Sequence, residues 1–273
     1  MQKTFTTPEP VSLFVELQSG DLVVRTGDVS ETLVELSGKD ADDAIVEQHG
    51  NEVRVVARHG RGGFFGASSQ LDVRVSVPHD SRLTTKLGSA DLRVEGRLGQ
   101  SRLKTGSGDV QIEELGAAAF IETGSGDVRV HVVGGSLLVK CGSGDVTLDR
   151  LDGPAEVSTG SGDVLVGSAA EPVTVKSGSG NMRVREVHRD ILLSTASGDL
   201  VVDRMHRGQL TAKNVSGDIS VGIPAGVPVW TDISCLTGRV RSNLEGAGRP
   251  DEGQDFIELR AKTVSGDVSL EQI

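Results

Sequence analysis

The most regular feature of this sequence is an alternation of apolar and polar residues that restarts every 18 positions. Counted from the aspartate of each Ser-Gly-Asp turn, the first and third following positions are aliphatic, as at Val110 and Ile112. A second apolar run precedes the next turn, as at Ala119 and Ile121. Strict alternation in β-branched residues predicts strands that bury one face. The sequence of each unit therefore predicts a strand, a corner, a second strand and a Gly-Ser-Gly turn.

The same residue class returns at each position of the unit, so each position forms a column of like residues along the chain. A single unit cannot bury its own apolar face, but stacked units bury it against identical side chains above and below. We therefore predict an all-β fold, a parallel β-solenoid of the β-helix or β-roll kind with two or three faces and about ten coils. An antiparallel meander of hairpins would show the same period, although it gives no reason for the columns.

The first 80 residues lack the strict period but keep short alternating runs, such as residues 11–17. Terminal repeats of solenoids are usually atypical, because an exposed strand edge invites pairing with other chains. We therefore expect an N-terminal β-rich cap or subdomain over residues 1–80 and a solenoid of Ser-Gly-Asp repeats over residues 81–273. Asp21 belongs to an isolated copy of the turn inside the cap, and Arg239 marks a weak copy near the other end.

Composition narrows the classes of function. The 273 residues include 36 glycines and few aromatic residues, which suits short strands joined by tight turns. The net charge is −11 without a basic block, which argues against nucleic-acid binding, since affinity for a phosphate backbone comes from Lys and Arg. No stretch approaches the roughly 20 apolar residues that span a bilayer, and the start lacks a signal-peptide pattern. We therefore expect a cytoplasmic protein without membrane insertion. Residues 60–69 should form a loop that carries two apolar rings, and residues 243–255 an exposed Gly-rich polar loop.

Cys141 and Cys235 are the two cysteines, and each lies four positions before a turn aspartate or its equivalent. They therefore share one column and lie five coils apart. At ~4.8 Å per strand this separation is about 24 Å, whereas a disulfide needs Cα atoms within roughly 7 Å. We predict two free thiols.

The serial Thr-Gly-Ser-Gly-Asp-Val units and the Val-Ser-Val-Pro run that ends at Pro78 carry a family resemblance. The chain resembles the bacterial β-strand-repeat domains of unknown function that bear the label "putative adhesin", and the resemblance covers nearly all of it. This resemblance implies a β-solenoid-like fold. It implies no assigned activity and no catalytic residues.

The turn position itself forms a row of acidic side chains, which is the first candidate site. Its members are Asp91, Asp109, Asp127, Asp145, Asp163, Asn181, Asp199, Asp218 and Asp267. Hard carboxylate oxygens in Gly-rich turns suit Ca²⁺, and the unit length matches a double repeat of the calcium-binding β-roll. The alternative is structural: each aspartate accepts backbone N–H bonds of its turn, which Asn181 could do equally well.

Other candidate sites are weaker. His188 and His206 occupy equal positions in neighbouring units and could hold a metal between them, but no third ligand repeats beside them, so a solvated pair is the plainer interpretation. Rows of Thr and Ser could suit ice binding, yet they share the parity of the inward columns. Clustered carboxylates could suit polysaccharide cleavage, yet the repeats offer few aromatic platforms and no nucleophile–base pair.

We therefore expect a non-enzymatic structural or interaction scaffold without catalytic residues or cofactors. Its expected partner is another protein or a second copy of the chain, joined by end-to-end strand pairing. A calcium-binding β-roll that uses the turn aspartates is the alternative.

Overall fold

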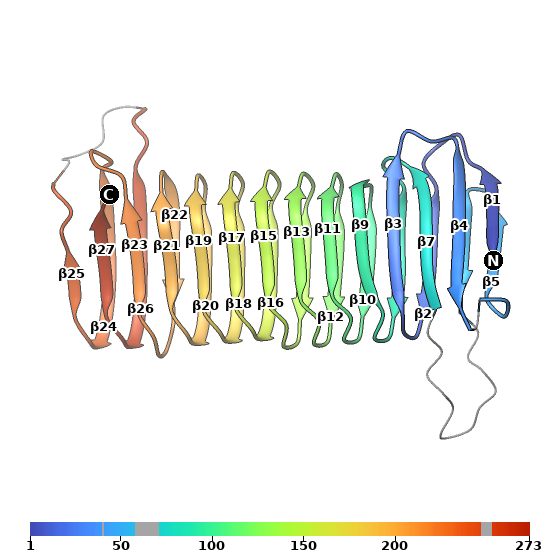
Figure 1. Ribbon diagram of the computed structural model, residues 1–273. Helices are drawn as coiled ribbons and strands as arrows, with labels where there is room; N and C mark the ends of the chain where they lie inside the picture. The colour runs from blue at the N-terminus through green and yellow to red at the C-terminus, as the bar shows by residue number, and fades with distance from the viewer. Residues whose placement is uncertain (40, 58–70, 247–252) are drawn as a thin grey trace, which may run out of the picture. The chain divides into compact units, whose positions relative to one another are not determined.

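The computed structural model describes residues 1–39, 41–57, 71–246 and 253–273. The chain forms two compact units, Met1–Leu138 and Val139–Ile273, and β14 (Leu137–Cys141) carries the chain from one to the other. All regular elements in the described residues are β-strands, which confirms the all-β prediction (Figure 1). The domain boundary at residue 80 stays a prediction, as does the loop over residues 60–69, which lies outside the described residues.

The Met1–Leu138 unit consists of two sheets. The strands of one, in spatial order, are β1 (Gln2–Thr6), β4 (Glu31–Gly38), β7 (Leu71–Pro78), β3 (Asp21–Gly27), β9 (Asp91–Leu98), β11 (Val110–Leu115) and β13 (Val128–Val133). The strands of the other are β5 (Ile45–His49), β6 (Glu52–Val56), β2 (Ser12–Leu17), β8 (Arg82–Leu87), β10 (Ser101–Thr105) and β12 (Ala119–Thr123). Each coil contributes one strand to each sheet, so the solenoid has two faces.

The Val139–Ile273 unit repeats this plan. One sheet contains β15 (Val146–Leu151), β17 (Val164–Ala169), β19 (Met182–Val187), β21 (Leu200–Met205), β23 (Ile219–Ile223), β27 (Val268–Gln272) and β25 (Val240–Ser242). The other contains β16 (Ala155–Ser161), β18 (Val173–Ser179), β20 (Ile191–Ser197), β22 (Gly208–Lys213), β26 (Ile257–Ser265) and β24 (Val229–Thr237). All strand pairs described in this unit are parallel.

The repeat register is the one that the columns predict. Val110 lies beside Val128, and Val164 lies beside Met182, each in parallel strands. The inward columns are buried, with Val130 and Val166 fully inaccessible to solvent. The alternative of an antiparallel meander is therefore wrong for the repeats, because in these coils like side chains stack on like across parallel neighbours.

The order of coils at the start of the chain differs from the order in the sequence. The isolated turn at Asp21 is a full member of the stack, because β3 pairs with β9 and places Asp21 beside Asp91. On its other side β3 pairs with β7, which lies about 50 residues further along the chain. Beyond β7 the pairing becomes antiparallel through β4 and β1, and β5 is likewise antiparallel to β6. The two sheets of the first unit therefore end in antiparallel strands, β1 in one and β5 in the other.

The end of the second unit shows a similar rearrangement. Stacking in chain order would put the Arg239 coil directly on the Asp218 coil. Instead β27 pairs with β23 on one side and with β25 on the other, so the Asp267 coil lies between them. The strands β24 and β25 are therefore the last of the two sheets, although β26 and β27 come later in the sequence.

The turns require glycine because successive coils approach closely. Gly180 has a φ of +134°, and a Cβ at this position would overlap the carbonyl oxygen of Gly162 in the coil before it.

The predicted column of small polar residues lies just inside the turn, and its side chains bond the turn backbone. The N–H of Gly126 donates to Thr123 Oγ1 (3.0 Å), whereas Thr159 Oγ1 donates to the carbonyl of Ser161 (3.1 Å). The same motif thus adopts two turn conformations.

Candidate functional site

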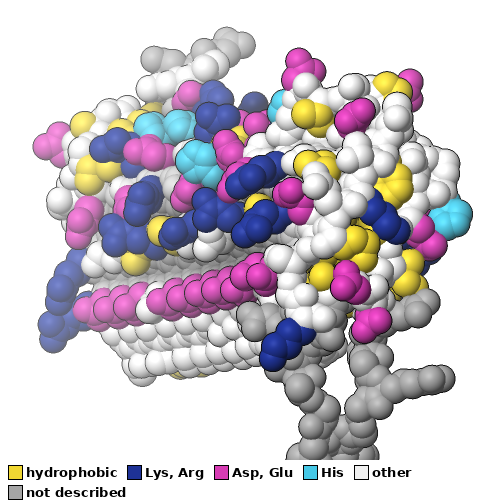
Figure 2. All heavy atoms as spheres, turned by 45° about the vertical axis from the view of Figure 1, so that its right-hand side comes forward, with side chains coloured by type: hydrophobic (Ala, Val, Ile, Leu, Met, Phe, Trp, Pro, Cys, Tyr) yellow, Lys and Arg dark blue, Asp and Glu magenta, His cyan; other side chains and the backbone are white. Residues whose placement is uncertain are grey.

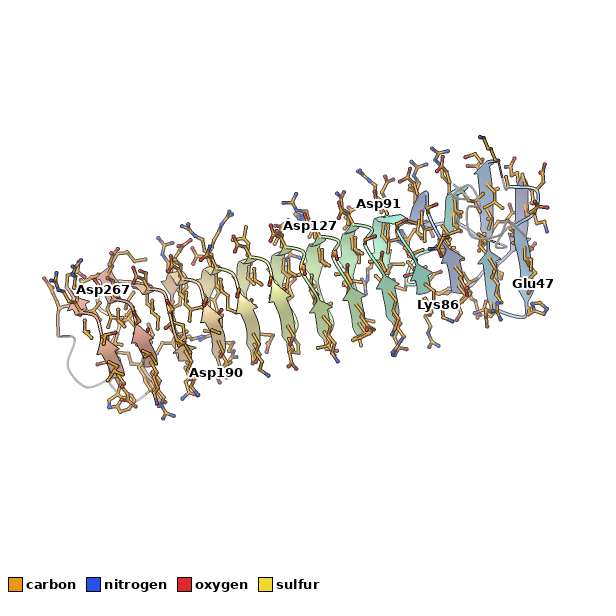
Figure 3. All side chains as sticks on the ribbon, turned by 90° about the horizontal axis from the view of Figure 1, so that it is seen from below. Glu47, Lys86, Asp91, Asp127, Asp190 and Asp267 are labelled. Atoms are coloured by element: carbon orange, nitrogen blue, oxygen red, sulfur yellow. The ribbon has the colours of Figure 1, made fainter. Side chains whose placement is uncertain are left out.

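The aspartate row links coils rather than closing individual turns. In the first unit the N–H of Asp109 donates to Asp91 Oδ1 (2.8 Å), and the N–H of Asp127 donates to Asp109 Oδ1 (2.9 Å). Asp91 and Asp127 lie along the same edge in Figure 3, and Figure 2 shows acidic side chains aligned in a row. The expectation that each aspartate bonds its own turn is wrong, because the donor belongs to the next coil.

The same bond recurs through the second unit. The N–H of Asn181 donates to Asp163 Oδ1 (2.7 Å), and Asn181 Oδ1 in turn accepts the N–H of Asp199 (2.9 Å). The remaining bonds of this kind join Asp145 to Asp163, Asp199 to Asp218, Asp218 to Asp267 and Asp267 to Arg239. Asn181 therefore fits the row without a charge, since its amide oxygen makes the bond that a carboxylate makes.

These contacts give the calcium alternative no support. One oxygen of each acidic side chain in these bonds is occupied by a backbone N–H, which restricts how many oxygens could converge on one ion. Of the described residues, only Glu186, His188 and His206 bring three potential ligand atoms within 4.8 Å of one another, and none of these belongs to the row. In the bonds described above, the row joins successive coils, an arrangement that neither interpretation made from the sequence specified.

The cluster of Glu186, His188 and His206 lies where β19 and β21 end. The two imidazole rings are stacked, with centroids 4.4 Å apart and planes 9° from parallel. His206 Nε2 lies 2.7 Å from Glu186 Oε2, and Arg204 Nη1 donates to Glu186 Oε1 at 3.1 Å. The sequence predicted the two histidines as neighbours but missed Glu186, which shares no column with another glutamate in this unit. Its position two residues before His188 was the available signal.

Partial burial lowers the pKa of His188, and the neighbouring His206 lowers it further. Desolvation acts against the charged form of an imidazole, and a second imidazole close by acts in the same direction. His188 therefore favours the neutral form, in which one ring nitrogen keeps a free lone pair. A cavity of 570 Å³ borders the cluster and is lined by His188 and Arg207 together with Asp190 and Asp255.

The outer end of the second unit is a different kind of surface, which we call the open end. It consists of β24, β25 and the residues that line a cavity of 370 Å³ beside them, including Ile233, Val240 and Leu244. Ile233 and Val240 continue the inward columns, because they pair with the buried Ala261 and Val268. No strand described in the structure stacks on their other side, and Val240 is 51% exposed.

Neither cysteine forms a disulfide, as predicted. Cys141 is buried in the turn column, where its Sγ accepts the N–H of Gly144 at 3.1 Å. Cys235 lies in β24 and is partly exposed. No helix that could cross a bilayer occurs in the described part of the chain.

A family model matches residues 11–169 and again residues 120–271, and its description is Toastrack DUF4097. The chain belongs to the Toastrack DUF4097 family. This membership agrees with the solenoid-like repeat fold, and it confirms the resemblance found in the sequence. The family is one of unknown function, so its name assigns no reaction to the chain. No protein of curated function matches the sequence.

Solved bacterial structures show distant similarity. A "putative adhesin" from Parabacteroides distasonis is 10% identical, with a TM-score of 0.38, and the match covers 100% of this chain and 96% of that one. A "putative lipid binding protein" from the same species is 12% identical, with a TM-score of 0.37 and the same coverage. A "putative cell adhesion protein" from Clostridium sporogenes is 12% identical, with a TM-score of 0.23, and covers 100% and 99%. Likenesses this distant carry no functional argument.

Proposed function

We propose that this Toastrack protein is a non-enzymatic interaction scaffold whose open end binds a second copy of the chain. The observation that carries the proposal is the uncovered apolar surface of the last coil. Ile233 and Val240 continue columns that are buried elsewhere, but here only one side of each is covered by a described coil. Solvated apolar columns of this kind are stabilised when another apolar surface covers them.

The edges of the sheets support the same proposal. Strand β24 pairs only with β26 among the described strands, and β25 pairs only with β27. Each therefore presents a row of backbone donors and acceptors to a further strand.

A second copy is the occupant that fits this surface most directly. A two-fold axis at the open end would bring apolar columns against apolar columns and edge strands against antiparallel edge strands. Such an interface is closed, so it covers both open ends at once and stops at a dimer. The opposite end of the chain does not offer the same surface, because β1 is a mostly exposed, polar strand at the edge of its sheet. The dimer would then present each sheet face twice, once from each chain.

The non-enzymatic part of the proposal is supported by the chemistry of the described residues. The aspartate row uses carboxylate oxygens in bonds between coils, as at Asp163 and Asp218. A phosphate-binding loop requires a lysine after its glycines and a helix that begins there. The Gly-Ser-Gly turns instead lead into β-strands. We propose no resident cofactor for these turns.

The test is the oligomeric state of the full chain over a dilution series, measured by sedimentation velocity. We expect a reversible dimer with a dissociation constant of about 10 μM or tighter. Ile233→Lys places a charge in the apolar column and should yield monomer. Ser234→Lys is the matched control, because Ser234 is exposed on the other face of β24, and this variant should still dimerise. A native chain that stays monomeric up to about 100 μM would refute the proposal.

We also propose that the protein works in the cytoplasm. Two free thiols, one of them partly exposed, suit a reducing compartment, since oxidising compartments favour disulfides. Fractionation of the bacterial cell with detection of the native protein tests this point, and recovery from the envelope or medium would contradict it.

A further inference from the structure

The cluster formed by Glu186, His188 and His206 has a geometry that neither the scaffold role nor the fold requires. Val187 and Met205 are paired across β19 and β21, so His188 and His206 follow them side by side. The backbone holds this arrangement, because the N–H of His188 bonds Ala169 O (3.0 Å) and that of His206 bonds Val187 O (2.9 Å). The two imidazoles thus protrude at the spacing of neighbouring coils, with a carboxylate within hydrogen-bonding distance of one of them.

We propose that Glu186, His188 and His206 bind one divalent transition-metal ion of the zinc class. Two imidazole nitrogens and one carboxylate oxygen form a typical ligand set for zinc, with solvent in the remaining position. Potential ligand atoms of the three side chains already lie within 4.8 Å of one another. Ligands at about 2.0–2.2 Å from a common ion would lie closer together, and the two parallel rings would turn toward the ion, changes that rotation of these half-exposed side chains can supply.

The groups around the cluster are arranged to position its carboxylate. Arg204 Nη1 holds Glu186 Oε1 at 3.1 Å, which leaves Oε2 directed at His206 Nε2. A hydrogen-bonded carboxylate of this kind is oriented as carboxylates that bind metals usually are. An ion bound by Glu186 Oε2 and His206 Nε2 would replace the direct contact between these two atoms.

Nearby positive charge is partly neutralised. Arg207 lies beside His188, and its Nη1 is 3.4 Å from both carboxylate oxygens of Asp255. Asp190 and Asp255 also line the cavity that borders His188 and Arg207, so a cation approaching from solvent meets carboxylates as well as guanidinium groups.

The test uses the full chain, without a histidine tag and stripped with chelator, titrated with ZnCl₂ by calorimetry at neutral pH. We expect one Zn²⁺ per chain, and the visible absorption of bound Co²⁺ should report nitrogen and oxygen ligands. His188→Ala and His206→Ala should each weaken Zn²⁺ binding at least about tenfold, and Glu186→Gln should weaken it as well. Ca²⁺ should give no heat at the same concentration, since two imidazoles suit a softer ion.

Glu171→Gln is the matched control, because Glu171 lines the same cavity but lies outside the cluster. His131→Ala controls for general histidine loss, since His131 belongs to the Met1–Leu138 unit. Both should bind Zn²⁺ as the native chain does. Absence of binding to the native chain overturns the proposal, as does undiminished binding by the double variant His188→Ala/His206→Ala. Full affinity in Glu186→Gln would remove Glu186 from the site.

Discussion

At the scale of single residues, the aspartate row balances one favourable contact against one unfavourable contact. Each bond from a backbone N–H to a carboxylate stabilises the junction between two coils. Successive carboxylates one strand spacing apart also repel one another. Asn181 shows how the sequence can keep the bond and remove the repulsion, since its Oδ1 accepts the N–H of Asp199 at 2.9 Å.

The row therefore predicts opposite outcomes for two substitutions of Asp199, whose Oδ1 accepts the N–H of Asp218 at 2.9 Å. Asp199→Ala removes the bond and should lower the free energy of unfolding by about 1 kcal/mol. Asp199→Asn keeps the bond and removes a like charge, so we expect stability equal to or above that of the native chain. Urea denaturation, followed by circular dichroism, measures both.

The salt dependence of the same pair provides the control. Any advantage of Asp199→Asn should shrink as salt screens the row, while the loss in Asp199→Ala should persist. Equal destabilisation by both substitutions would show that the charge itself is needed, in contradiction to the structural interpretation of the row.

At the scale of elements, the turn depends on glycine for steric reasons that substitution can test. Gly180→Ala forces a Cβ toward the carbonyl oxygen of Gly162 and imposes a φ of +134° on an alanine. We expect a loss of about 2–4 kcal/mol, measured as a shift in the urea midpoint. Gly246→Ala is the control, because nothing lies near its added Cβ, and it should leave the midpoint nearly unchanged.

The repeating elements could be predicted from the sequence because the packing of each coil on the next produces both the 18-residue period and the burial of the apolar columns. A column such as Val110 and Val128 keeps its residue class because each member packs on the next, so the alternation specifies both the strand and its register. The partner of each turn aspartate could not be predicted in the same way. Its own turn and the next coil both offer backbone N–H groups, and only the spacing of the stack decides between them.

The histidine cluster could likewise be predicted from the sequence only in part. Equal positions in two units predicted that His188 and His206 would be neighbours, because the period alone requires it. Glu186 belongs to a column that holds Ser168 and Arg204 in the neighbouring coils, so no repeat marks it. Its contact with His206 depends on a side-chain direction at the end of β19, which a periodic pattern does not specify.

At the scale of the whole molecule, each unit ends in a way that its repeats do not dictate. The inward columns of any coil fit those of any other coil, so periodicity alone allows several orders of stacking. Asp21 joins the row beside Asp91 across about 70 residues of chain, and Asp267 precedes Arg239 in space. Pairing between distant segments decides these positions, and loops tolerate the detours because the entropy of loop closure grows slowly with length.

The order of the last coils can be tested by cross-linking in the Val139–Ile273 unit. Ser265 pairs with Ser216 on one side and with Thr237 on the other, so Ser216 and Thr237 lie two strand spacings apart. Cysteines at 216 and 265 should oxidise to a disulfide, because adjacent strands bring Cα atoms about 5 Å apart. Cysteines at 216 and 237 should not, at about 10 Å.

Both cysteine pairs are introduced into a chain that carries Cys141→Ser and Cys235→Ser, so that no native thiol competes. The chain is oxidised at low protein concentration, and mass spectrometry identifies the linked peptides. Stacking in chain order makes the reverse prediction, since it places the Arg239 coil directly on the Asp218 coil and so brings 216 beside 237. Efficient linkage of 216 to 237, with none between 216 and 265, would mean that β24 is an interior strand. The open end would then be formed by β26 and β27, and Ile233 would have a coil on each side.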